Sequence, residues 1–83
     1  MSVNWADFTA RRGVVPMYRQ LAQWIEARIA AGDLKSGDGL PSEAGLADAT
    51  GMSVDTVRQA LAVLRDKGLV ETATGIGSFI ASQ

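Results

Sequence analysis

Residues 42–68 read SEAGLADATGMSVDTVRQALAVLRDKG, and this stretch decides the fold. It holds two short helical patterns separated by a break at Gly51. Ser42 is a favourable N-cap for the first helix and Ser53 for the second. Gly68 supplies a left-handed stop after the second helix. A turn of three or four residues that contains glycine is typical of two helices set at a steep angle, so the stretch predicts a helix-turn-helix.

The apolar residues give each of these helices an inward face. In the second helix they fall at positions i, i+3, i+4 and i+7, namely Val57, Ala60, Leu61 and Leu64. In the first helix we expect the inward face to consist of Leu46, Ala47 and Ala49. Gly45 costs this helix roughly 1 kcal/mol relative to alanine, so it depends on tertiary support.

The flanking segments complete an order of helix, short strand, helix, helix and hairpin. A helix is predicted after Pro16, with one apolar stripe of Tyr18, Leu21, Ala22, Ile25 and Ile29. A glycine-rich loop with a short strand near Leu40 follows it. Two strands are predicted at residues 69–73 and 78–81. The fold class is therefore mainly α with a small β-hairpin, a winged helix-turn-helix of three helices plus a wing.

Residues 1–15 stand apart from this unit, which we expect to span residues 16–83. Asn4 can cap a short helical turn, and Trp5 and Phe8 are i, i+3 neighbours. Two interpretations stay open. The segment is either a frayed terminus or an N-terminal arm or short helix that docks its aromatic side chains. As an arm, it is a candidate for dimerisation or for binding a protein partner.

The amino-acid composition excludes several classes of function. Eighty-three residues suffice for one domain. Because the chain has no cysteine and no histidine, the usual zinc sites, serine triads and cysteine nucleophiles are excluded, and we expect neither an enzyme nor a cofactor or metal. No apolar stretch approaches the roughly 20 residues that span a membrane. The N-terminus lacks the order of a signal peptide, so a cytoplasmic location without membrane contact is expected.

A helix-turn-helix suggests DNA as the partner, because its second helix presents its N-terminal residues to the major groove. The residues of that helix left over from the core stripe are Val54, Asp55, Thr56, Arg58 and Gln59. Polar side chains of this kind reach base edges or phosphates. The hairpin would form the wing, and its glycines permit close approach of the backbone to DNA.

The motifs, taken together, resemble the N-terminal winged helix-turn-helix domain of the GntR family of bacterial transcription regulators. The resemblance covers about Pro16 to Ser82. Its markers are Leu40-Pro41-Ser42-Glu43, Leu46-Ala47, Ser53 with Thr56-Val57-Arg58, Ala60-Leu61, Gly68-Leu69-Val70, and the wing Gly75-x-Gly77-x-Phe79.

This resemblance implies a homodimer that binds a double-stranded DNA operator at paired, inverted half-sites and represses transcription. By matching position, it implies that the DNA-facing residues are Ser42, Glu43, Ser53, Thr56, Arg58, Gly75 and Gly77. The chain departs from the family pattern at Ala44 and Val54, where arginine is usual, and at Ile76, where a basic or polar wing-tip residue is usual. We keep all three as candidate contacts and expect Ala44 and Val54 to face outward.

These departures also support an alternative of another class. Ala44, Val54 and Ile76 could form an apolar surface of a protein-interaction module with weak or lost DNA binding. The net charge is −1, and residues 34–83 carry four Lys or Arg against six Asp or Glu. Since each missing phosphate contact removes part of the counterion-release contribution, one domain alone is expected to bind DNA weakly.

Overall fold

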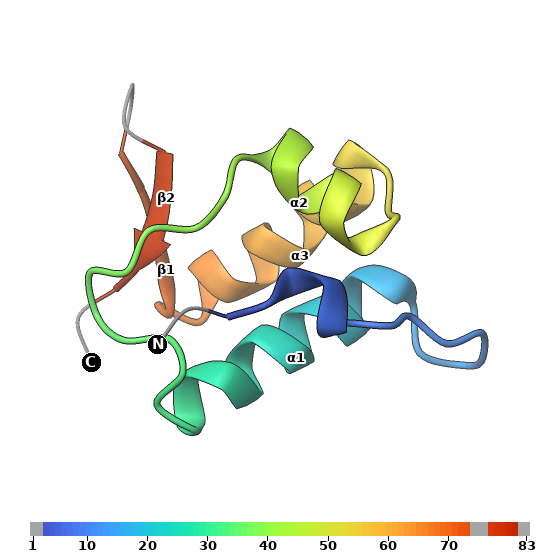
Figure 1. Cartoon of the computed structure of the whole chain (residues 1–83), viewed down its shortest axis with the longest axis horizontal. Helices are drawn as coiled ribbons and strands as arrows, with labels where there is room; N and C mark the ends of the chain where they lie inside the picture. Colours follow the sequence, from blue (N-terminus) through green and yellow to red (C-terminus); the bar gives the residue numbers. More distant parts are fainter. Residues whose placement is uncertain (1–2, 74–76, 82–83) are drawn as a thin grey trace.

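The computed structural model describes residues 3–73 and 77–81. Its elements are η1 (Trp5–Asp7), α1 (Met17–Ala30), α2 (Glu43–Thr50), α3 (Val54–Asp66), β1 (Val70–Ala73) and β2 (Gly77–Ile80). Helix α3 packs against α1, α2 and β1, and the hairpin stands at one end of the helices (Figure 1). The predicted fold of three helices plus a hairpin is confirmed.

Helix α3 supplies the centre of the hydrophobic core. All four residues predicted to face inward are buried, namely Val57, Ala60, Leu61 and Leu64. Leu21 and Ile25 of α1, together with Leu46 of α2, are fully buried against this cluster. Complete burial of a leucine or isoleucine side chain contributes roughly 1.5–3 kcal/mol, so the core holds the three helices at fixed positions.

The predicted capping residues stabilise the N-terminal ends of both helices of the helix-turn-helix. Ser42 Oγ accepts a hydrogen bond from the Gly45 N–H at 3.0 Å, and Ser53 Oγ accepts one from the Thr56 N–H at 3.1 Å. Gly51 follows α2 with a φ of 75°, a left-handed conformation that a side chain with a Cβ adopts only with strain. The position at which α3 begins is therefore encoded locally.

The prediction is wrong for one residue that was expected on the inward face of α2. Ala49 is exposed, whereas Thr50 is half-buried and its hydroxyl donates a hydrogen bond to the Leu46 carbonyl at 2.6 Å. Residues i and i+4 lie above one another on a helix. In this two-turn helix the buried side is centred on Leu46 and turned toward Thr50 rather than Ala49.

The hairpin is antiparallel, with each strand boundary within one residue of the prediction. The short strand expected near Leu40 is reduced to a single bridge between Gly39 and Phe79. Beside it, the Leu40 N–H donates a hydrogen bond to the Ser78 carbonyl at 2.9 Å. The connection between α1 and α2 is thereby fastened to β2, which fixes the hairpin relative to α2.

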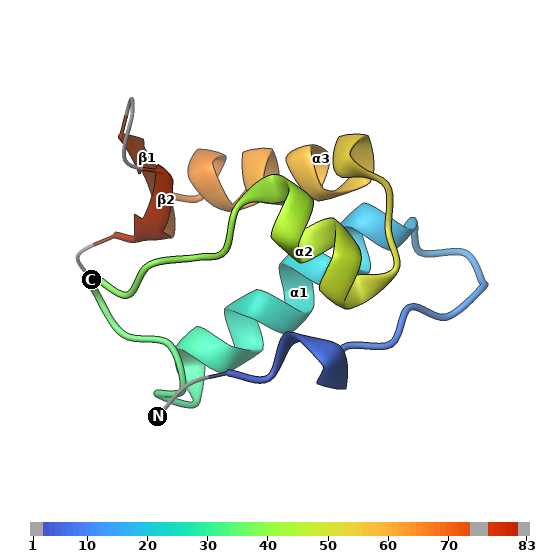
Figure 2. The ribbon, with the colours of Figure 1, turned by 45° about the horizontal axis from the view of Figure 1, so that its top comes forward.

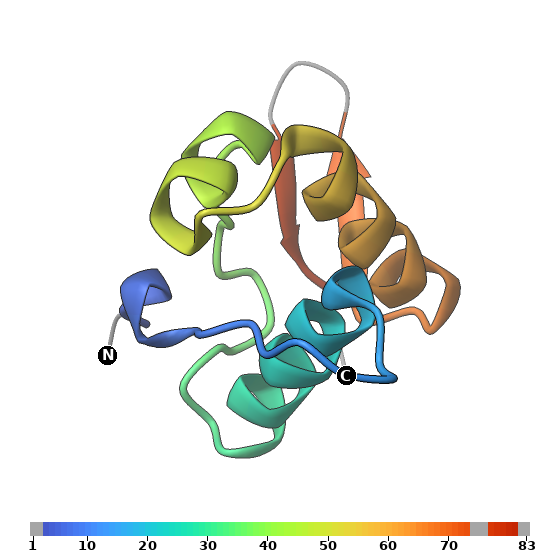
Figure 3. The ribbon, with the colours of Figure 1, turned by 90° about the vertical axis from the view of Figure 1, so that its right-hand side faces the viewer.

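The described part of the N-terminal segment is docked. Asn4 Oδ1 accepts a hydrogen bond from the Ala6 N–H at 3.1 Å and caps η1. Phe8 belongs to the core, with 6% of its surface exposed. The rings of Trp5 and Phe8 lie 5.7 Å and 5.8 Å from the ring of Trp24. Helix η1 lies beside α2 (Figures 2 and 3), and the ring contacts with Trp24 join the segment to α1, so this packing fits the docking interpretation rather than the frayed one.

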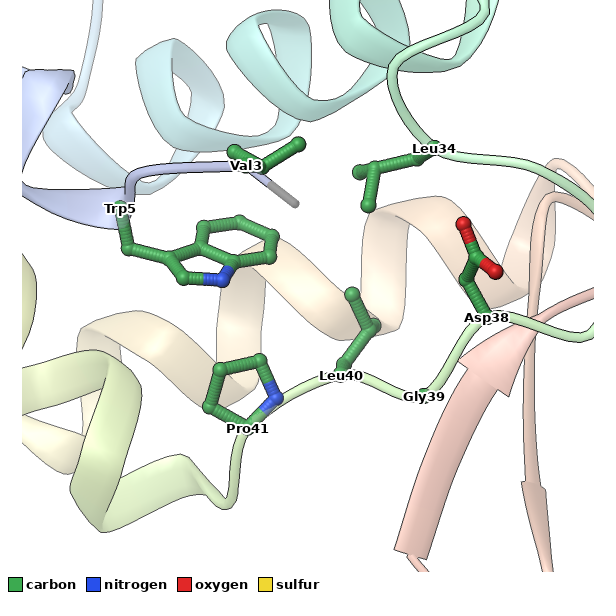
Figure 4. A pocket seen from close by; sticks show the side chains of 7 residues that line it. All are labelled: Val3, Trp5, Leu34, Asp38, Gly39, Leu40 and Pro41. Atoms are coloured by element: carbon green, nitrogen blue, oxygen red, sulfur yellow. The ribbon is translucent and has the colours of Figure 1, made fainter. Parts of the chain in front are cut away.

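A pocket separates the N-terminal segment from the loop that leads into α2 (Figure 4). Val3 and Trp5 face Leu40 and Pro41 across it, and Asp38 stands at one end. The Asp38 carboxylate already accepts a hydrogen bond from the backbone of the same loop.

Within the described ranges, no helix is long and apolar enough to cross a membrane.

Candidate DNA interface

The first turn of α2 and the N-terminal half of α3 meet through an ion pair. Arg58 Nε donates a hydrogen bond to Glu43 Oε1 at 2.9 Å, although the two residues are fifteen positions apart. Figures 1 and 2 show the hairpin at the C-terminal end of α3, whereas α3 begins at the opposite end, beside α2. The ion pair therefore brings predicted contacts on α2 and α3 together, while the hairpin lies at the other end of α3.

Arg58 is the cation among the predicted contact residues, and 60% of its side chain is exposed to solvent. Its Nη1 also lies 3.6 Å from Asp55 Oδ1, one turn earlier on α3. The hydrogen bond that Arg58 donates to Glu43 and the charge of Glu43 raise the pKa of Arg58 above its ordinary value, with a further contribution from the charge of Asp55 and an opposing effect of desolvation. The guanidinium thus stays charged, and two carboxylates hold it in place while offsetting its charge.

The hydroxyl groups predicted to contact DNA serve first as caps. Ser53 Oγ and Thr56 Oγ1 lie 2.8 Å apart at the start of α3, and Ser53 also accepts the Thr56 N–H. Ser42 plays the same part at α2. Because a hydroxyl that accepts a hydrogen bond can still donate one, the caps leave O–H groups for an anion beside the positive end of each helix dipole.

The remaining candidates differ in exposure. Ala44, Asp55 and Gln59 are exposed as expected, and 88% of the Asp55 side chain is in solvent. Val54 is half-buried, so the expectation that it faces outward is only partly met. Gly77 is exposed at the start of β2. The candidates Gly75 and Ile76 lie outside the described residues.

Sequence reasoning missed Arg65. It lies seven positions after Arg58, or about two turns of α3, so both side chains are on the same side of the helix. Arg65 Nη1 donates a hydrogen bond to Thr72 Oγ1 of β1 at 3.2 Å. The signal available in the sequence was this seven-residue spacing of two arginines outside the core stripe.

A cleft with both apolar and polar side chains runs between the start of α2, α3 and the hairpin. Its lining consists of Leu40, Pro41, Ser42, Glu43, Leu61, Arg65, Thr72, Ala73, Gly77 and Ser78. Three of the predicted contacts, Ser42, Glu43 and Gly77, are in this lining. Those at the start of α3, including Arg58, lie outside it. Glu43, which lines the cleft, links it to Arg58 through their ion pair.

Comparison with known protein families shows to which family this chain is related. The family described as "Bacterial regulatory proteins, gntR family" matches residues 17–80. The chain belongs to the gntR family. The resemblance inferred from the motifs is confirmed, and the family and fold are those of DNA-binding transcription regulators rather than enzymes.

Two relatives of this gntR-family chain come from Escherichia coli K12. It is 42% identical over 71 residues to the mannosyl-D-glycerate transport/metabolism system repressor MngR. The aligned region covers 86% of this chain and 30% of the repressor. It is also 42% identical over 66 residues to the Glc operon transcriptional activator, covering 80% of the chain and 26% of the activator. The chain thus spans less than a third of either relative.

A solved structure of similar fold contains DNA. The DNA-binding domain of AraR in complex with operator ORX1 superposes with a TM-score of 0.83 and 28% sequence identity. The match covers 89% of this gntR-family chain and 95% of that domain. The winged helix fold is therefore shared almost over its full extent.

Proposed function

We propose that this gntR-family domain binds a double-stranded DNA operator in a sequence-specific manner, with α3 in the major groove and the hairpin beside the adjoining minor groove. The observation that carries the proposal is the exposed Arg58 guanidinium, held near the start of α3 by Glu43. Recognition helices use their N-terminal residues for base contacts. A guanidinium donates two parallel hydrogen bonds to guanine, or binds a phosphate.

The proposed contacts divide by chemistry. Hydroxyl groups at the two helix starts donate to phosphates: that of Ser42, and that of whichever of Ser53 and Thr56 accepts in their mutual hydrogen bond. Side chains on the exposed part of α3 meet base edges: Arg58 and Gln59 by hydrogen bonds, Val54 at a thymine methyl, and Asp55 at a cytosine amino group. Glu43 positions Arg58, and Ala44 lies against the sugar-phosphate backbone of the DNA. The proposed wing tip consists of Gly75, Ile76 and Gly77.

We further propose that two copies bind inverted half-sites as a homodimer and repress transcription in the bacterial cytoplasm. The net charge of −1 supports the need for two copies, because a single domain offers little counterion release. Repression is the direction named for MngR, whereas the Glc relative is an activator. The sign of regulation would therefore depend on where the operator lies relative to the promoter.

The alternative is a protein-interaction module in which Ala44 and Val54 contact a partner, with the N-terminal segment as a second contact. Val54 is half-buried, which reduces the apolar area that such a partner would cover. Trp5 and Phe8 already pack on Trp24 of the same chain, so they offer less surface to another protein. We therefore favour DNA as the partner.

Selection of bound sites from a random DNA pool tests the proposed function. The full chain should enrich an inverted repeat whose half-site centres are about one helical turn, or a multiple of it, apart. Arg58→Ala, with its fold checked by circular dichroism, should lose the enrichment at a guanine position. A pool that stays random with folded wild-type protein would contradict sequence-specific binding.

A further inference from the structure

Arg65 differs from the other basic side chains near the candidate interface. Arg58 is paired with Glu43, and Lys67 is paired with Glu26 at 3.0 Å. Within residues 3–73 and 77–81, Arg65 has no carboxylate within ion-pair distance, and its polar partner is the Thr72 hydroxyl. One of its five N–H donors is used there, so an uncompensated guanidinium remains at the cleft.

The hairpin supplies two hydroxyl groups at the same place. Thr72 and Ser78 are directly opposite in the register of β1 and β2, and Thr72 Oγ1 lies 3.2 Å from Ser78 Oγ. Two hydroxyls that share one hydrogen bond leave one O–H free, whichever of them donates. A cation and a free hydroxyl donor therefore line the same cleft.

The acidic residue of the cleft does not cancel this charge. Among the described residues that line the cleft, Glu43 is the one with a carboxylate, and its Oε1 accepts a hydrogen bond from Arg58 at 2.9 Å. Ser42, also in the lining, keeps a free O–H while its oxygen caps α2. The cleft thus offers donors from α2, α3 and the hairpin to an anion.

We propose that Arg65, positioned by Thr72 and Ser78, binds a phosphate of the DNA backbone in the cleft between α3 and the hairpin. This inference rests on the proposed function, since a strand that passes from the groove at α3 to the groove at the wing crosses this cleft. Arg65 replaces part of the phosphate binding that Ala44 and Val54 lack. It contributes to affinity for any sequence and not to the choice of operator.

The test compares two variants with the same change in charge. Arg65→Gln keeps the aliphatic stem and a donor for Thr72 but loses the charge, and Lys35→Gln makes the same change in the loop between α1 and α2, outside the cleft lining. Binding of each full chain to a random-sequence duplex is measured across a salt series. For Arg65→Gln, the slope of log affinity against log salt should become shallower by about 0.9, with Lys35→Gln unchanged.

Two further variants separate charge from position. Arg65→Lys should restore the slope. Thr72→Val should weaken binding by a factor on the order of 2 to 10 at fixed salt, with the slope retained, because the charge stays while its hydrogen bond is lost. Melting temperatures should match wild type in all cases, since Arg65 and Thr72 are exposed.

Equal slopes for Arg65→Gln and Lys35→Gln, with wild type still binding, would overturn this inference and leave the proposed function standing. A changed base preference in Arg65→Gln would also overturn it, because the contact would then be to a base. Wild-type protein that fails to bind DNA at low salt would overturn the proposed function and this inference together.

Discussion

The ion pair between Arg58 and Glu43 has two consequences at the scale of single residues. It orients the guanidinium near the start of α3, and in the proposed complex the carboxylate would compete with DNA for the same N–H donors. An exposed ion pair contributes only about 0–1 kcal/mol to stability. Removing Arg58 should therefore affect binding far more than folding.

The first prediction concerns Arg58→Ala. Loss of a guanidinium contact should weaken binding to the selected operator by about 1–3 kcal/mol, with the melting temperature nearly unchanged. Arg19→Ala, which removes an exposed arginine from α1, is the control for loss of charge. Fluorescence anisotropy with labelled operator measures both. Unaltered affinity in folded Arg58→Ala would remove Arg58 from the interface.

The second prediction concerns the two positions where family members usually have arginine. Ala44→Arg should change the free energy of unfolding by no more than about 0.5 kcal/mol, because Ala44 is exposed. Val54→Arg should cost more, since Val54 is half-buried. Each added phosphate contact should steepen the salt dependence by roughly 0.9.

Urea unfolding and a salt series measure the two effects separately. An unfolded double variant would show that one of the two positions belongs to the core. A folded double variant that binds DNA no more tightly than wild type would speak against DNA as the ligand of this surface.

At this scale, capping interactions within a few residues could be predicted from the sequence, whereas side-chain contacts between different elements could not. Ser42 and Ser53 were identified as caps because an N-cap acts within three residues. The Arg58–Glu43 pair joins residues fifteen positions apart, and Arg65 meets a hydroxyl on a strand. Such contacts depend on how α2, α3 and the hairpin are arranged, which periodicity alone does not specify.

At the scale of elements, the turn between α2 and α3 sets the angle at which α3 would meet DNA. Gly51 has a φ of 75°, and a Cβ placed on it would meet no heavy atom within 4 Å. Any cost of substitution there arises from the backbone conformation rather than from a clash.

The third prediction follows from this geometry. Gly51→Ala should lower the free energy of unfolding by about 1–2 kcal/mol, the cost of a left-handed conformation for a residue with a Cβ. Gly51→Asn should cost less, because asparagine tolerates this conformation better. Chemical denaturation of both variants provides the measurement. An alanine variant as stable as wild type would mean that the turn adopts another conformation.

The N-terminal segment illustrates what periodicity leaves open. Trp5 and Phe8 indicated either docking or fraying, and only their packing on Trp24 distinguishes the two. The short strand near Leu40 likewise became one bridge, because a single stretch of chain cannot indicate how long its pairing partner runs.

The fourth prediction tests the docking of this segment. Phe8→Ala should destabilise the domain by about 3–5 kcal/mol, the usual cost of truncating a buried phenylalanine. Thr9→Ala, at an exposed neighbouring position, should have little effect. Denaturant midpoints measure the difference. A Phe8→Ala variant within about 1 kcal/mol of wild type would show that the segment adds little to the core.

At the scale of the whole molecule, the proposed DNA interface has to be reconciled with a net charge of −1. The chain carries eight Lys or Arg and nine Asp or Glu, so its overall field does not attract DNA. Two copies on adjacent half-sites would double the phosphate contacts. We therefore expect operator binding to be cooperative, with single half-sites bound poorly.

The most direct test of the central claim is an equilibrium titration of the full chain with the selected two-half-site duplex and with a scrambled duplex of equal composition. Our account predicts binding to the selected duplex that is tighter by more than about tenfold. It also predicts cooperativity that disappears when one half-site is scrambled. Equal affinity for the selected and scrambled duplexes would contradict the claim that this domain reads DNA sequence.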